Sequence, residues 1–137
     1  MTSAEPIFHL SLSCADRAAT ERFYTDLGAE IGRRRGDWIN VWLFGAQITF
    51  HEWPDKVPPA PYDEGLHFGA TLPMPRWQSL AADLSGASFE RAPRYDPETG
   101  TAKMYLRDPN GYVVELKAYD DPGAALERPE LASRQGT

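Results

Sequence analysis

Short stretches in which hydrophobic and polar residues alternate recur along the chain, and this period of two is typical of β-strands with one buried face. Together with runs rich in β-branched and aromatic residues, they predict strands at residues 7–13, 29–35, 38–44, 47–51, 66–72, 88–91, 101–107 and 111–118. Two other stretches, 16–27 and 73–85, have apolar residues three and four positions apart, which predicts helices with one buried face.

The first predicted helix carries recognisable signals at both ends. Asp16 is suited to the N-cap, because its carboxylate can accept a backbone N–H of the first turn, and Gly28 is a good C-terminal stop. The residues predicted to form the buried stripes of the two helices are Ala19, Phe23 and Leu27 in the first, and Trp77, Leu80, Ala81 and Leu84 in the second.

The order of the elements repeats along the chain. Residues 7–52 and 66–118 each predict one strand, a helix and three further strands, which makes two modules of roughly 50 residues. The connector at 53–65 contains four of the 12 prolines, a density that disfavours both a helix and a central strand. We therefore expect a single domain of the α+β class, built from two β-α-β-β-β modules and followed by a polar tail at 119–137.

Composition and charge narrow the functional classes. The 137 residues are 42% hydrophobic and 25% charged, as in globular proteins, and the net charge of -6 argues against nucleic-acid binding. The basic run Arg33–Arg35 is expected to be a solvated strand end, and Cys14, the single cysteine, a small buried residue. No stretch has the pattern of a signal peptide or a membrane span, so we expect a cytoplasmic protein without membrane partners.

A carboxylate stands in the last predicted strand. The turn residues 108–111 precede a run in which Val113, Glu115 and Lys117 share one face. A buried glutamate is costly without a partner, which leaves two interpretations. Either the strand is an edge strand with Glu115 in water, or the carboxylate points into a cavity and binds a cation.

The three histidines also lie in predicted strands. Each of His9, His51 and His67 taken alone is expected to be a core histidine with one backbone hydrogen bond. His9 and His67, however, open equivalent strands of the two modules. Together with Glu115 they would form a set of two imidazoles and one carboxylate, which suits Fe(II) and also Mn, Co, Ni or Zn.

The last strand of the first module corresponds to the strand that holds Glu115. If Ile48 and Phe50 face the helix, then Gln47, Thr49 and His51 face the other way. A neutral amide, Gln47, would then stand where a second carboxylate ligand might be expected. This residue is a candidate fourth ligand, but a weak one for a hard divalent ion.

Two tryptophans in the strand at 38–44 bear on the kind of ligand. Trp38 and Trp42 share one face with Phe44, and aliphatic residues occupy the opposite face. If the tryptophan face lines a cavity, the cavity has flat walls and suits an aromatic or similarly planar ligand. If the tryptophans pack against the helix instead, this inference fails.

The paired modules resemble the vicinal oxygen chelate superfamily, which includes glyoxalase I, bleomycin-resistance proteins and extradiol ring-cleaving dioxygenases. The motifs that carry the resemblance are Phe8-His9-Leu10, Arg22-Phe-Tyr-Thr-Asp-Leu-Gly28, Leu66-His67-Phe68 and Arg107-Asp-Pro-Asn-Gly-Tyr-Val-Val-Glu-Leu116. It covers roughly residues 7–118, and it implies two sheets that curl into one mixed sheet around a central cavity.

The resemblance also implies a metal site. His9, His67 and Glu115 match the three commonest metal-ligand positions of the superfamily, and Gln47 matches the position where bacterial glyoxalase I places a glutamate ligand. Because that glutamate serves as the catalytic base, its replacement by Gln47 disfavours lactoylglutathione lyase activity. Bleomycin-binding members lack metal ligands, so the retained ligands speak against a protein that only sequesters a drug.

The remaining pattern is most similar to that of the extradiol dioxygenases. It implies a divalent metal ion, with Fe(II) favoured over Mn, Zn, Ni or Co, which brings the vicinal oxygens of a small substrate within reach of O2. His51, Tyr105 and Tyr95 are candidate acid–base or hydrogen-bonding residues. Two alternatives are a metal-dependent lyase or isomerase acting through an enediolate, and a small-molecule binding protein without catalysis. We also expect a homodimer, in which the cavity forms within one chain or between swapped modules.

Overall fold

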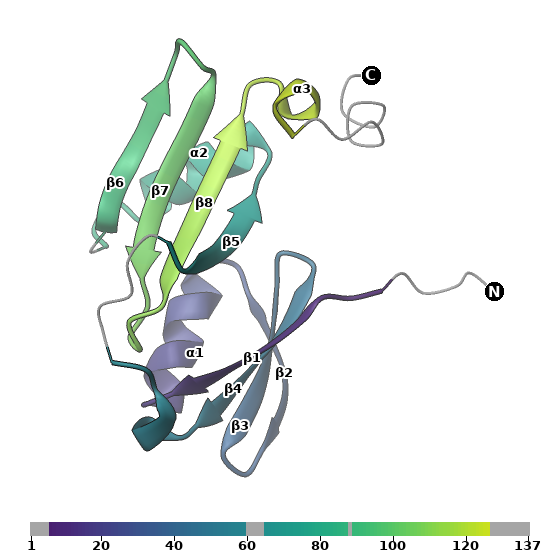
Figure 1. The fold of residues 1–137 in the computed structure, drawn as a ribbon, viewed down its shortest axis with the longest axis vertical. Coiled ribbons are helices and arrows are strands. Elements are labelled where there is room, and N and C mark those ends of the chain that lie inside the picture. The colour runs from purple at the N-terminus through teal and green to yellow at the C-terminus, as the bar shows by residue number, and fades with distance from the viewer. Residues whose placement is uncertain (1–5, 60–64, 88, 127–137) are drawn as a thin grey trace, which may run out of the picture. The chain divides into compact units, whose positions relative to one another are not determined.

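The structure is a computed structural model that describes residues 6–59, 65–87 and 89–126 (Figure 1). The helices are α1 (Arg17–Asp26), α2 (Met74–Asp83), α3 (Pro122–Leu126) and the short 3-10 helix η1 (Pro54–Lys56). The strands are β1 (His9–Cys14), β2 (Glu30–Arg35), β3 (Trp38–Leu43), β4 (Ala46–Glu52), β5 (His67–Thr71), β6 (Phe89–Asp96), β7 (Thr101–Arg107) and β8 (Val113–Tyr119). Each predicted strand and helix is therefore present.

The chain forms two units, Met1–Gly65 with Asp108–Tyr112 and Leu66–Arg107 with Val113–Thr137. Each unit holds a four-stranded sheet, in the order β1-β4-β3-β2 in the first and β5-β8-β7-β6 in the second. In each sheet the first and last strands of the module pair in parallel, and the other pairs are antiparallel. This confirms the α+β class and the repeated β-α-β-β-β order.

Helix α1 begins as predicted, because the Asp16 side chain accepts the N–H of Ala19 at 3.0 Å. The predicted buried stripe is correct at Leu27 but wrong by one position at Ala19 and Phe23, which are half-buried. The helix buries Thr20 and Tyr24 instead. The hydrophobic pattern did not predict burial of Thr20 and Tyr24, because each side chain carries a polar hydroxyl group. Both hydroxyls have partners here, and the Thr20 hydroxyl donates to the backbone oxygen of Asp16 at 2.8 Å.

The sheet of the first unit has one face against α1 and one open face. Ile39, Val41 and Phe50 are fully buried, and the rings of Tyr24 and Phe50 lie 5.0 Å apart. Ile48 and Phe50 are buried on the side of α1, as the prediction for Gln47 required, so Gln47 lies on the open face. Trp42 is 39% exposed, so it lies on the open face and not against α1.

The turn at Asp108–Tyr112 belongs to the first unit and is held by buried side-chain hydrogen bonds. Asp108 accepts from the Tyr24 hydroxyl at 2.7 Å, and the Tyr112 hydroxyl donates to the backbone oxygen of Ser13 at 2.6 Å. Asn110 accepts the N–H of Ala15 at 2.9 Å. Burial raises the pKa of the Asp108 carboxyl, and burial together with the neighbouring Asp108 raises the pKa of Tyr24 well above its usual value. The turn motif thus has a structural role.

Replacement of Tyr24 by Phe is expected to lower the free energy of unfolding by roughly 1–3 kcal/mol, because it removes a donor from a buried carboxylate. The Tyr24 hydroxyl also lowers the pKa of Asp108, so its loss raises that pKa further. The loss in stability should therefore be largest above the folded-state pKa of Asp108 and shrink as the pH falls through that pKa. Urea denaturation at several pH values measures it.

The matched control is Tyr95→Phe, which removes an exposed hydroxyl that donates to Asp120 at 2.5 Å. Exposed pairs contribute little, so this variant should unfold like the parent chain. Equal losses in the two variants would contradict the role given to the buried Tyr24–Asp108 hydrogen bond.

In the second unit, α2 covers one face of the sheet. Trp77 is buried and its Nε1–H donates to the backbone oxygen of Leu116 at 2.8 Å. Val114 and Leu116 are fully buried on this side, so Glu115, between them in the strand, points to the opposite face. Strand β8 lies between β5 and β7, which rules out the interpretation of Glu115 as an edge-strand residue.

Two segments differ from the prediction. Strand β6 extends to Asp96, five residues beyond the expected end at 91, because the pairing with β7 shifts register and thereby accommodates Pro93. The connector contains η1, where prolines were expected to prevent a helix. Pro54 opens this helix, at a position where the N–H that proline lacks has no partner in any case.

Cys14 is fully buried, as expected, and burial raises the pKa of its thiol. Among the described residues, no helix is long and apolar enough to cross a membrane.

Candidate functional site

The second unit brings together His67 and Glu115. His67 opens β5 and Glu115 lies in the neighbouring strand β8, and the Nε2 atom of His67 is 2.9 Å from Oε2 of Glu115. Glu115 is only 8% exposed. Two neighbouring ligands on one metal ion, at bond lengths near 2.1 Å, lie about 3 Å apart. A buried carboxylate and an imidazole at this separation therefore fit a divalent ion.

Tyr105 lies beside this pair. It is the register partner of Glu115 on β7, and its ring centroid is 5.8 Å from that of His67 in an edge-on arrangement. The guanidinium of Arg91, on β6, lies 5.8 Å from the centroid of the Tyr105 ring. The half-buried phenol thus stands next to the predicted ligands with an arginine on its other side.

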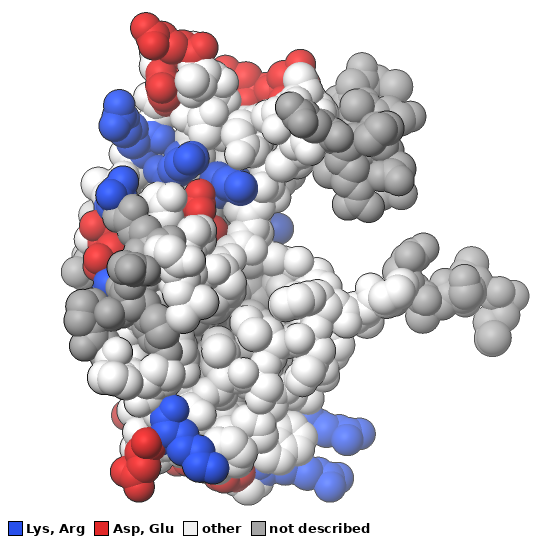
Figure 2. All heavy atoms as spheres, in the orientation of Figure 1, with Lys and Arg blue, Asp and Glu red and all other residues white. Residues whose placement is uncertain are grey.

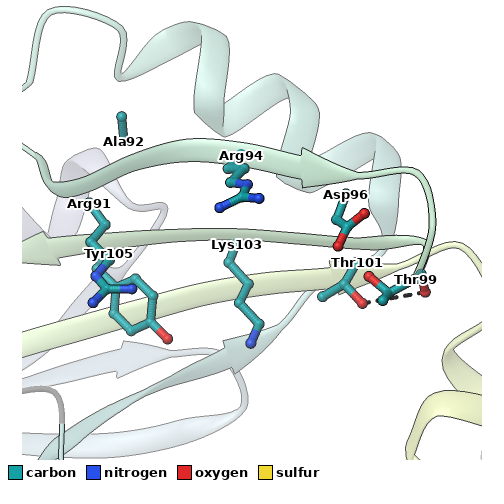
Figure 3. A pocket seen from close by; sticks show the side chains of 8 residues that line it. All are labelled: Arg91, Ala92, Arg94, Asp96, Thr99, Thr101, Lys103 and Tyr105. Carbon is teal, nitrogen blue, oxygen red and sulfur yellow. Dashed lines mark hydrogen bonds between the residues drawn. The ribbon is translucent and has the colours of Figure 1, made fainter.

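Two adjacent depressions open on this face of the second sheet. The smaller, of about 260 Å³, is lined by His67, Phe68, Gly69, Ala70, Thr71, Glu115 and Lys117. The larger, of about 490 Å³, is lined by Arg91, Ala92, Arg94, Asp96, Thr99, Thr101, Lys103 and Tyr105 (Figure 3). They adjoin because Lys103 and Tyr105 are the register partners of Lys117 and Glu115.

The sequence placed Lys117 on the face of Glu115 but did not predict a cluster of basic residues on this face. Arg91, Arg94 and Lys103 line the larger depression, and Lys117 lines the smaller. Alternation along β7 and β8 gives the face of Lys103 and of Lys117, and the register of the two strands then makes them neighbours. The arginines could not be placed, because the register of β6 shifts between Arg91 and Arg94.

The first unit brings together the other predicted pair. His9 in β1 and Gln47 in β4 are register partners, and Nδ1 of His9 lies 3.1 Å from Oε1 of Gln47. The two pairs are not in equivalent register, because Glu115 stands opposite Gly69, two residues beyond His67. Counted from the histidines, Thr49 occupies the place in the first sheet that Glu115 holds in the second.

His51 is not brought together with His9 and Gln47. It lies four residues beyond Gln47 in the same strand, a separation of about 13 Å along β4. Its ring stacks on Trp53 with centroids 4.1 Å apart, and its Nδ1 is buried without a hydrogen-bond partner in the described part of the chain.

Tyr95 is not part of the second-unit site. It pairs with the buried residue Ala102, so it lies on the face opposite to Lys103 and Tyr105, and its hydroxyl donates to Asp120. Over residues 6–59, 65–87 and 89–126, no group of three or more His, Cys, Asp and Glu side chains is assembled as a metal site. Each unit by itself supplies two of the four predicted ligands.

A family model for the glyoxalase/bleomycin resistance protein/dioxygenase superfamily matches residues 7–116. The chain belongs to this superfamily. The match covers the motifs from His9 to Glu115 and confirms the resemblance drawn from them. No curated protein matches the chain.

Solved structures of the superfamily share the fold. A glyoxalase/bleomycin resistance protein/dioxygenase from Alicyclobacillus acidocaldarius is 26% identical, with a TM-score of 0.74 over 88% of this chain and 96% of that one. A glyoxalase/dioxygenase from Nostoc punctiforme is 15% identical, with a TM-score of 0.68 over 87% and 98% of the two chains. The fosfomycin resistance protein FosX from Listeria monocytogenes is 17% identical, with a TM-score of 0.67 over 85% and 94%.

Proposed function

We propose that the chain is a metal-dependent enzyme of the superfamily that uses His9, His67 and Glu115 as metal ligands, with Gln47 as a weaker fourth. The observation that carries the proposal is the buried Glu115 carboxylate, 2.9 Å from the His67 imidazole in the middle of a sheet. A divalent cation would offset the cost of burying that charge. Fe(II) is the favoured ion for two histidines and one carboxylate, with Mn, Zn, Ni or Co as alternatives.

The proposed reaction is of the extradiol dioxygenase type, on a small aromatic or vicinal-oxygen substrate. Such an ion acts as a Lewis acid and a template for substrate oxygens. Tyr105, at 5.8 Å from the His67 ring, is the residue best placed to hydrogen-bond a substrate oxygen or to exchange a proton with it. His51 contributes to binding only if the substrate reaches along β4.

The open face of the first sheet favours one alternative. Trp42 is 39% exposed and Trp38 half-buried on that face, which suits the binding of a planar ligand without catalysis. A lyase acting through an enediolate is the other alternative, and Gln47 in place of a carboxylate base weighs against it.

A homodimer in the cytoplasm is part of the proposal. Three large apolar side chains next to the predicted ligands are exposed, Ile7 by 55%, Phe8 by 67% and Leu66 by 62%. Exposed apolar side chains of this size, two in the first unit and one in the second, favour a protein partner for each unit. A second copy of the chain would cover them and could supply the ligands of the complementary unit.

Elemental analysis of protein purified without chelator, combined with an O2-uptake assay on catechol-type substrates, tests the function. Bound metal with O2 consumption supports the dioxygenase. Bound metal with no O2 uptake, but with proton exchange next to a carbonyl, supports the lyase. Absence of metal together with tight binding of aromatic ligands would contradict the proposed enzymatic function and support a small-molecule binding protein.

A further inference from the structure

Three positively charged residues form one row across the second sheet. Arg94 on β6 pairs with Lys103 on β7, and Lys103 pairs with Lys117 on β8. Directly paired residues point to the same face, so the three side chains are neighbours. Figure 2 shows Lys and Arg side chains gathered over this sheet, and Figure 3 shows Arg94 and Lys103 in the larger depression.

This row is electrostatically costly. Like charges directly opposite each other destabilise a sheet. Among the other arginines that the structure describes, Arg107 pairs with Glu90 at 2.9 Å and Arg34 pairs with Glu21. In the described part of the chain, neither Arg94 nor Lys103 has such a partner. A protein with a net charge of -6 therefore concentrates unneutralised positive charge at one place.

The carboxylates nearby do not neutralise the row. Glu115 faces the His67 imidazole, and Asp96, the one carboxylate lining the larger depression, lies next to Thr101 at its far end and accepts the N–H of Glu98 at 3.0 Å. The row remains a concave surface of positive charge.

The row adjoins the predicted metal ligand. Arg91, Tyr105 and Glu115 form the next row of the sheet, two residues along each of β7 and β8. Two residues of a strand span about 7 Å. A small molecule about 7 Å long with one end at Glu115 can therefore place its other end over Lys103 and Lys117.

We propose that the substrate carries a doubly charged oxyanion group, a phosphate or phosphonate, which lies on the row of Arg94, Lys103 and Lys117. Arg91, 5.8 Å from the Tyr105 ring, flanks the same group. Oxyanions bind such residues through short charge-assisted hydrogen bonds. The position of the reacting end of the substrate rests on the proposed function. The anion site itself depends only on the row of Arg94, Lys103 and Lys117.

Titration of the full-length, EDTA-treated protein with inorganic phosphate at low ionic strength, followed by calorimetry, tests the site. Saturable binding is expected, with acetate binding more weakly because it carries one charge. Lys103→Gln and Arg94→Gln should each weaken phosphate binding roughly tenfold, because each removes a charged donor. Added NaCl should weaken it further.

The matched control is Arg22→Gln, which removes one charge from an exposed position on α1 in the other unit. It should leave phosphate affinity unchanged. No saturable phosphate binding, or equal weakening by Lys103→Gln and Arg22→Gln, overturns the anion site. If acetate binds as tightly as phosphate, the proposal that the substrate carries a doubly charged group is wrong. Failure of the metal proposal would appear separately, as a parent protein that binds phosphate but no metal.

Discussion

Glu115→Gln is expected to lower the affinity for divalent metal by at least about 100-fold, since loss of a supporting residue alone costs up to that much. The exchange keeps the shape of the side chain but replaces a charged carboxylate with a neutral amide. Elemental analysis after dialysis against the chosen metal gives the result. His67→Ala should have the same effect, because the imidazole of His67, the other proposed ligand in this unit, lies 2.9 Å from the Glu115 carboxylate.

Neither variant should lose the fold, because neither side chain belongs to the face packed against α2. Circular dichroism and thermal denaturation check this. Glu30→Gln is the matched control, since it makes the same exchange at an exposed position on β2 and should bind metal like the parent chain. Unchanged metal content in Glu115→Gln or His67→Ala would show that the proposed ligand set is wrong. An unchanged affinity in Gln47→Ala would remove only Gln47 from it.

The sequence predicted the elements and their order because their signals are local. Alternation, an N-cap and turn residues act within a few positions, as with Asp16 at the start of α1. The buried face of α1 could not be predicted by hydrophobicity, since Tyr24 is buried through a hydrogen bond to Asp108, 84 residues away.

The same contrast between local signals and long-range contacts applies to the candidate site. The parity of β8 correctly placed Glu115 on the face away from α2, because a period of two fixes the face of each residue. The offset between the pairs His9–Gln47 and His67–Glu115 depends on how parallel strands align, which alternation along one strand does not specify. The basic row was hidden for a similar reason, since the bulged β6 decides which arginines face the lysines.

Gly69→Ala is expected to destabilise the second unit severely, because the added methyl group would clash with the backbone of the neighbouring strand. Gly69 stands opposite Glu115 in the β5–β8 pair. A Cβ at Gly69 would overlap the Glu115 backbone, at 2.7 Å from its carbonyl carbon and 2.9 Å from its nitrogen. Backbone in a central strand cannot move aside as a flexible side chain can, and glycine in a strand often marks such a close approach.

The loss in free energy of unfolding should exceed about 3 kcal/mol, the upper end of the usual range for overpacking, because the clash is with backbone atoms. Urea denaturation measures it, and Gly86→Ala is the control, because a Cβ at Gly86 meets nothing within 4 Å. Any Gly69→Ala protein that folds should have β5 displaced from β8, which separates His67 from Glu115 and weakens metal binding. Full stability in Gly69→Ala would mean that the two strands do not approach as closely as the site requires.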